Sequence, residues 1–275
     1  MVLGTSGCGS ESETEAGSPV VSTTPAVKAP VQSEEPAAST SRPATGVMFA
    51  YAEVEGKLAR GYFSYPDDMS EPLPALLLIH DWYGLDDTMR ALSDRIASLG
   101  YVVFAVDLYE GKTGSKPADT REQSVRLLER PALAEQNIEQ ALEFMEKSAG
   151  SPRIAVQGFG SGGLLALNTA MRYPDKINAL IVVQGQTIND EETLRSLGMP
   201  VLGIFGSGDR SISTDQVKAF GDALKAANIT HEMRLYPNAS SGFMIPGSNN
   251  YNEKQAENAF GVLREFLSMN LASQP

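Results

Sequence analysis

The sequence predicts an α/β fold in which a mostly parallel β-sheet is covered by helices on both faces, with antiparallel strands at its start. Short, uninterrupted runs of Val, Ile and Leu recur along the chain, as in parallel strands that are buried on both sides. Segments with the periodicity of helices lie between these runs. The chain has 275 residues, of which 42% are hydrophobic, so it can bury the core of one large domain.

The chain is expected to divide into two parts near residue 46. Residues 1–46 are dominated by Ser, Thr, Glu, Pro, Ala and Gly, and the first aromatic side chain is Phe49. Such a segment buries too little apolar surface to offset the entropy that is lost on ordering. We therefore expect a disordered tether over residues 1–46 and a globular domain over residues 47–275.

Two patterns predict the strands. Residues 47–65 alternate apolar and polar side chains and break at Glu55-Gly56, which indicates two paired antiparallel strands. Continuous apolar runs predict buried parallel strands at 75–79, 101–106, 154–156, 179–183 and 201–205. Ligands of such sheets bind beyond the carboxyl ends of the strands, so the loops after these runs form the candidate site.

Helical periodicity predicts the segments that connect and close the strands, at 87–99, 120–148, 162–172, 213–227 and 252–271. Pro131 lies inside the second segment and removes a backbone donor there, so we expect two helices in place of one. Ser213 and Gln216 have the spacing of a capping box, which favours a helix start at this point.

The composition excludes several classes of function. The net charge of −12 repels phosphate backbones, so no nucleic-acid partner is expected. One cysteine, Cys8, and two histidines, His80 and His231, are too few for a disulfide framework or a zinc cluster. We therefore expect no metal and no cofactor. The sequence also contains no run of 18 apolar residues that could span a bilayer.

The first residues resemble the cleavage region of a bacterial lipoprotein precursor. The motif reads Leu3-Gly4-Thr5-Ser6-Gly7-Cys8, and in that family Cys8 would carry the lipid. Thr5 stands where Leu is usual, and no basic and apolar export signal precedes it, which a start codon placed too late would explain. The resemblance implies a protein exported to the cell envelope and held at the membrane only through its lipid anchor. The alternative is a chance Gly-Cys pair in a cytoplasmic protein.

Five motifs follow predicted strands in a fixed order: IHDWYGL at 79–85, VDLYEG at 106–111, GFGSGG at 158–163, PVLGIFGSGD at 200–209 and YPNASSGF at 236–243. Together they resemble the dienelactone hydrolase family of α/β-hydrolases, over about residues 47–272. The resemblance implies an α/β-hydrolase fold. It also implies hydrolysis of ester or lactone bonds by a nucleophile, an acid and a histidine that are carried on three of these loops.

Two of the three catalytic positions that the resemblance implies carry unsuitable residues. Gly158 and Gly162 take the places that flank the nucleophile in the strand-turn-helix elbow, so Gly160 holds the nucleophile's own position and has no side chain to attack with. Asp209 occupies the position of the acid. Ser241 stands where the family carries its histidine.

A shift of the elbow by one residue would make Ser161 the nucleophile, although a large side chain would then crowd the turn at Phe159. We instead expect Ser161 to cap the following helix, with its N–H free to bind an anion. The histidines offer weak substitutes for the missing base. His231 lies in an extended strand remote from the site, and His80 ends the strand that leads to the oxyanion loop.

The candidate ligand-binding residues are Asp81, Trp82, Tyr83 and Ser161. Trp82 and Tyr83 could form the walls of a pocket or serve only to pack their loop. Asp81 matches an acidic residue that helps activate the family's thiol and is left without a task. Two hypotheses follow: a non-hydrolytic relative that binds a small ester, lactone, carboxylate or protein partner, and an active ester or lactone hydrolase that uses Ser161 or an unidentified nucleophile. The sequence predicts no oligomeric state.

Overall fold

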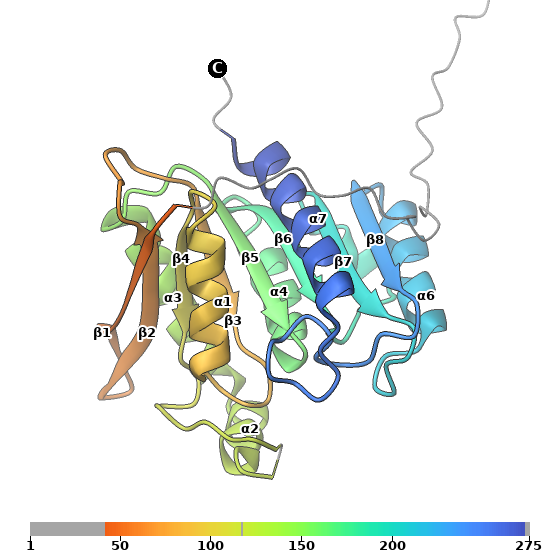
Figure 1. Ribbon diagram of the computed structural model, residues 1–275, viewed down its shortest axis with the longest axis horizontal. Coiled ribbons are helices and arrows are strands. Elements are labelled where there is room, and N and C mark those ends of the chain that lie inside the picture. Colours follow the sequence, from red (N-terminus) through yellow and green to blue (C-terminus); the bar gives the residue numbers. More distant parts are fainter. Residues whose placement is uncertain (1–41, 117, 273–275) are drawn as a thin grey trace, which may run out of the picture.

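The computed structural model describes residues 42–116 and 118–272, so Cys8 and most of the predicted tether lie outside the described residues. Its centre is an eight-stranded sheet with the order β1-β2-β4-β3-β5-β6-β7-β8 (Figure 1). The strands are β1 (Ala44–Val54), β2 (Lys57–Pro66), β3 (Ala75–Ile79), β4 (Val102–Val106), β5 (Ile154–Phe159), β6 (Ile177–Val183), β7 (Val201–Gly206) and β8 (His231–Tyr236). β2 pairs antiparallel with both β1 and β4, and every other pair is parallel. The predicted fold class is confirmed.

The fold begins earlier than the sequence indicated, because β1 starts at Ala44 and not at residue 47. Three small residues at this end lack the apolar alternation that marks a strand, yet each pairs with a residue of β2. The ring of Tyr62 lies directly over Gly46, where a Cβ would come within 2.0 Å of its hydroxyl oxygen. The Thr45 hydroxyl also donates to Asp67, with Oγ1 2.7 Å from Oδ1.

Helices cover both faces of the sheet, with α1 and α7 on one face and α3, α4 and α6 on the other (Figure 1). The helices are α1 (Asp87–Ala97), α2 (Arg121–Glu129), α3 (Pro131–Lys147), α4 (Ser161–Arg172), α5 (Glu191–Leu194), α6 (Thr214–Ala226) and α7 (Glu253–Leu271). Pro131 separates α2 from α3 as predicted and takes the first position of α3, where its missing N–H costs nothing. The predicted capping box of Ser213 and Gln216 is present at α6. Among the described helices, none is both long and apolar enough to cross a membrane.

Each face of the sheet contributes to its own hydrophobic core, because successive strand residues point to opposite sides. One polar side chain interrupts this pattern on β5. Gln157 faces α1 and α7 between Leu78 and Ile181 and is fully buried. Neither its amide nitrogen nor its oxygen has a hydrogen-bond partner within the described part of the chain. The parallel strands all end at the same edge of the sheet, where the loops of the candidate site lie.

Candidate functional site

A sharp turn joins β5 to α4 at the carboxyl edge of the sheet. Gly160 forms its apex with φ +50° and ψ −115°, a backbone conformation that is costly for residues with a side chain. The Gly160 amide donates to the carbonyl of Val183 at the end of β6, at 3.0 Å. The apex therefore lies at residue 160, the position that the resemblance of the sequence motifs implies for a nucleophile.

The residues that flank the apex are glycines because backbone segments meet there. A Cβ on Gly158 would lie 2.1 Å from the carbonyl oxygen of Gly162. A Cβ on Gly162 would lie 2.4 Å from the carbonyl oxygen of His80, the residue that directly follows β3. These contacts bring the loop after β3 against the first turn of α4. The elbow is thus defined by close backbone packing and not by any reactive side chain.

Ser161 follows the apex and is the first residue of α4, so the expectation that it caps this helix is wrong. Gly160 takes the cap position, because the left-handed conformation of the turn extends up to the residue before the helix. The Ser161 side chain makes no hydrogen bond with the described residues. Its amide and that of Trp82 also lack an acceptor there, which leaves two donors near the apex.

Asp81 and Trp82 border the space above the apex. A Cβ at position 160 would lie 3.2 Å from the Cβ of Asp81 and 3.9 Å from Cδ1 of Trp82. Trp82 keeps 39% of its surface exposed and is therefore accessible to a ligand. Tyr83 is partly buried, and its amide donates to Oδ1 of Asp81 at 2.9 Å.

The Asp81 carboxyl group is buried, and this burial raises its pKa from 3.8 to about 6. The hydrogen bond from the Tyr83 amide lowers the pKa, and the negative charge of Asp86 raises it further. At neutral pH this side chain consequently holds a negative charge at the apex at a cost in free energy. A carboxylate in this state could accept a proton or orient a polar ligand.

Neither histidine is placed to act as a base at the apex. His80 is buried, and its Nε2 accepts the amide proton of Leu108 at 3.2 Å, so its Nδ1 carries the proton and donates to the carbonyl of Asp81 at 2.8 Å. Burial lowers the pKa of His80, which keeps the ring neutral. His231 is the first residue of β8 and so lies at the edge of the sheet opposite the elbow.

Asp209 and Ser241 lie in the loops that follow β7 and β8. The Asp209 carboxylate accepts the amide protons of Ser211 at 2.7 Å and Ile212 at 3.3 Å, which fixes its orientation within its own turn. Ser241 is exposed, and its carbonyl accepts a hydrogen bond from the Asn250 side chain at 2.8 Å. The two loops are in contact, because the Ser240 hydroxyl donates to the carbonyl of Gly208 at 3.3 Å.

Gln184, which no sequence motif indicated, holds the loop after β8 against the elbow. Gln184 directly follows β6 in a left-handed conformation, with φ +51°, and its side chain is buried. Its amide nitrogen donates to the carbonyl of Ser240 at 2.8 Å, while its amide oxygen accepts the N–H of Gly242 at 2.9 Å. Position 241 is therefore clamped on both sides. A polar residue directly after a buried apolar strand was the only sequence signal for this role.

Two cavities of the structure lie away from this turn. One of about 220 Å³ and one of about 510 Å³ adjoin each other between the β1–β2 hairpin, the loop after β4 and helix α2. Neither is lined by a predicted site residue. In the described ranges, no three His, Cys, Asp or Glu side chains are grouped so that they could hold a metal ion.

A match to a family model shows to which protein family the chain belongs. The model of the Dienelactone hydrolase family matches residues 59–271, which is most of the chain. The chain belongs to the dienelactone hydrolase family. The resemblance noted in the sequence motifs is thereby confirmed at the level of the family.

Individual relatives of this dienelactone hydrolase family member are distant. Protein usf of Aquifex pyrophilus is 24% identical over 222 residues, which cover 78% of this chain and 95% of that protein. A dienelactone hydrolase-like promiscuous phosphotriesterase from metagenomic libraries shares the fold with a TM-score of 0.74 and 18% identity, covering 84% of this chain and all of that one. A thermophilic esterase from Thermogutta terrifontis gives a TM-score of 0.61 at 20% identity, covering 83% of this chain and 94% of that one.

Proposed function

We propose that this member of the dienelactone hydrolase family binds a small carboxylate, ester or lactone at its elbow without hydrolysing it. The observation that carries the proposal is glycine at the apex of the turn. A nucleophilic elbow needs a side-chain oxygen or sulfur at this point, and Gly160 offers neither. The place of the site is inferred by analogy with the family. The absence of hydrolysis is inferred from the residues of this chain.

The remaining groups of the site support binding better than bond cleavage. Ser161 lies after the apex, and both ring nitrogens of His80 are engaged by the backbone, so this histidine is not available to activate the Ser161 hydroxyl. In enzymes of the subtilisin type, loss of the serine or the histidine reduces kcat about a million-fold. The free amides of Ser161 and Trp82 are well suited to hold a carboxylate or carbonyl oxygen.

Covalent labelling tests whether the site has a reactive serine. The protein and its Ser161→Ala variant are incubated with a fluorophosphonate, and the intact masses are measured. The proposal predicts no adduct on either protein beyond what a denatured sample acquires. A stoichiometric adduct that disappears in Ser161→Ala would establish the competing function, an ester or lactone hydrolase that attacks through Ser161.

Fluorescence tests whether the site binds a ligand. Trp82 is the only tryptophan in the sequence and lies at the apex, so its emission reports on this site directly. Titration with benzoate is expected to change the emission in a saturable way, whereas uncharged benzamide at the same concentration produces a smaller change. An emission that stays constant with benzoate would contradict carboxylate binding at the elbow.

The motif that ends at Cys8 suggests a membrane anchor for the protein. We propose that Cys8 carries a lipid and that the protein is anchored at the cell envelope, on the strength of the motif that ends at this residue. Mass spectrometry of the protein purified from its own membranes is expected to find a lipid-modified Cys8 as the first residue. An unmodified chain in the cytoplasmic fraction would favour the alternative of a chance Gly-Cys pair.

A further inference from the structure

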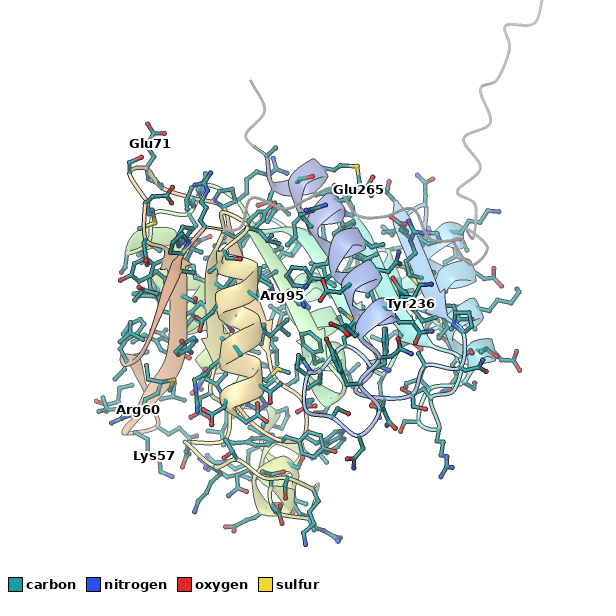
Figure 2. The ribbon with its side chains drawn as sticks, in the orientation of Figure 1. Lys57, Arg60, Glu71, Arg95, Tyr236 and Glu265 are labelled. Atoms are coloured by element: carbon teal, nitrogen blue, oxygen red, sulfur yellow. The ribbon has the colours of Figure 1, made fainter. Side chains whose placement is uncertain are left out.

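A second candidate site lies on the hairpin side of the sheet, at the two adjoining cavities. We call the smaller of these, with a volume of about 220 Å³, the hairpin cleft. It is lined by Val54, Lys57, Leu58, Ala59, Arg60, Asp107, Leu108, Glu110, Arg126, Leu127, Leu133 and Asn137. Figure 2 shows Lys57 and Arg60 at the lower end of β2, the edge of the molecule at which α2 lies in Figure 1.

Part of the floor of the hairpin cleft is apolar, beside the buried polar side chains of Asp107 and Asn137. Ala59, Leu108 and Leu133 are all buried and line it from three different elements, and Leu127 of α2 adds a partly buried side chain. Leu58 remains exposed at the entrance, with 60% of its surface accessible. An apolar floor with an exposed apolar entrance fits a ligand that carries a hydrocarbon portion.

The rim of the cleft carries three cations and one acidic side chain that is shared between two of them. Glu110 accepts from Lys57 at 3.0 Å and forms an ion pair with Arg126. Burial alone would raise the pKa of Glu110, but these two partners hold it below its ordinary value. The rim thus already binds one carboxylate, which the protein itself provides.

Arg60 is the cation of the rim that does not pair with Glu110. Its side chain is exposed and lines the cleft, and its guanidinium has no ion-pair or hydrogen-bond partner within residues 42–116 and 118–272. The other acid of the cleft, Asp107, forms no ion pair with Arg60 in the described ranges, and its two oxygens accept the amides of Tyr109 at 3.0 Å and Gly111 at 2.6 Å.

We propose that the hairpin cleft binds a small amphipathic monocarboxylate, with its carboxylate on Arg60 and its hydrocarbon chain on the apolar floor. Guanidinium groups pair with carboxylates through two parallel hydrogen bonds, which gives the site its preference for this head group. The volume lies below the range of pockets for drug-sized molecules, so the hydrocarbon chain is short. The site is separate from the elbow and does not rest on the function proposed there.

Calorimetric titration with octanoate tests this site in the intact protein. The expected result is saturable binding with one molecule per chain, and affinity about tenfold weaker in Arg60→Gln. Lys225→Gln is the matched control, because it also removes one exposed cation but lies on α6, away from the cleft. It should bind octanoate as the unmodified protein does. The thermal unfolding midpoint of each variant verifies that the fold is kept.

Two outcomes would overturn the proposal. One is octanoate binding that Arg60→Gln leaves unchanged, and the other is heat of titration indistinguishable from dilution. Octan-1-ol provides a further arm, because equal affinity for the neutral alcohol would show that the head group makes no contact with Arg60. A reactive Ser161 would overturn the function proposed for the elbow and leave each of these results as it is, so the two proposals fail separately.

Discussion

The elbow and the hairpin cleft lie at the same edge of the sheet but are built in different ways. At the elbow, glycines bring backbone segments into contact, and the shape of the turn is set without any side chain at the apex. In the hairpin cleft, the backbone only provides a frame, while charged and apolar side chains from four elements define the site. The difference teaches that a site defined by backbone packing holds its shape without help from a reactive side chain. A retained elbow is therefore weak support for a retained reaction.

The largest expected effect comes from breaking the backbone packing of the elbow. In Gly158→Ala, the new Cβ would come within 2.1 Å of the Gly162 carbonyl oxygen, which backbone atoms cannot relieve by a rotamer change. We expect a loss of about 4 kcal/mol or more in the free energy of unfolding, measured by urea denaturation. Gly261→Ala is the control, because its Cβ meets nothing within 4 Å on α7. It should gain about 0.5–1 kcal/mol from helix propensity. Equal stability of the two variants would contradict this description of the elbow.

The negative charge of Asp81 at the elbow should reduce the free energy of unfolding at neutral pH. Burial raises the pKa of Asp81 from 3.8 to about 6, so the folded protein retains this proton to higher pH than the unfolded chain does. Protonation of Asp81 therefore contributes to the free energy of unfolding. This contribution is fully present below pH 3.8, the pKa of Asp81 in the unfolded chain, and is lost as the pH rises through about 6. The total is about 3 kcal/mol at 1.36 kcal/mol per pKa unit.

Asp81→Asn isolates this effect, because an amide oxygen can still accept the Tyr83 amide proton. The gain in unfolding free energy over the unmodified protein is expected to be near zero at about pH 4 and to approach 3 kcal/mol at about pH 7.5. His80 titrates in both proteins and cancels in the difference. A gain that is the same at both pH values would be inconsistent with a buried, ionised Asp81.

A side chain at the apex should reduce the free energy of unfolding by a smaller amount. Gly160→Ala places a side chain at φ +50° and sets its Cβ 3.2 Å from that of Asp81, so we expect a loss of about 1–3 kcal/mol. Thermal and urea unfolding give the value. An alanine that is tolerated without loss would mean that position 160 is not a strained apex, and the assignment of the turn would have to be revised.

The smallest effect is expected on β5, three residues before the apex. Gln157 is fully buried with no partner for its amide group among the described residues, and Gln157→Met replaces it with an unbranched apolar side chain of similar length. We expect a gain of about 1–2 kcal/mol in unfolding free energy, because the cost of burying the polar group disappears. A loss of stability would indicate that the Gln157 amide is bound in the folded protein.

Sequence patterns were sufficient for features that a single segment determines. The buried strands follow from continuous apolar runs, the break between α2 and α3 follows from Pro131, and the place of Gly160 follows from the spacing of its flanking glycines. Features assembled from distant segments were beyond this reasoning. Gln184 acts only because the end of β6 meets the loop that follows β8. The hairpin cleft likewise depends on residues near 60, 108 and 130 that meet only in the folded chain.

The most direct test of the central claim is the rate of ester hydrolysis. The protein, its Ser161→Ala variant and the double variant Gly160→Cys with Ser241→His are compared with 4-nitrophenyl acetate under identical conditions. The expected result is that the unmodified protein and Ser161→Ala hydrolyse the ester no faster than buffer does. Only the double variant should gain activity. Turnover by the unmodified protein that is abolished in Ser161→Ala would contradict the claim that the attacking group is missing.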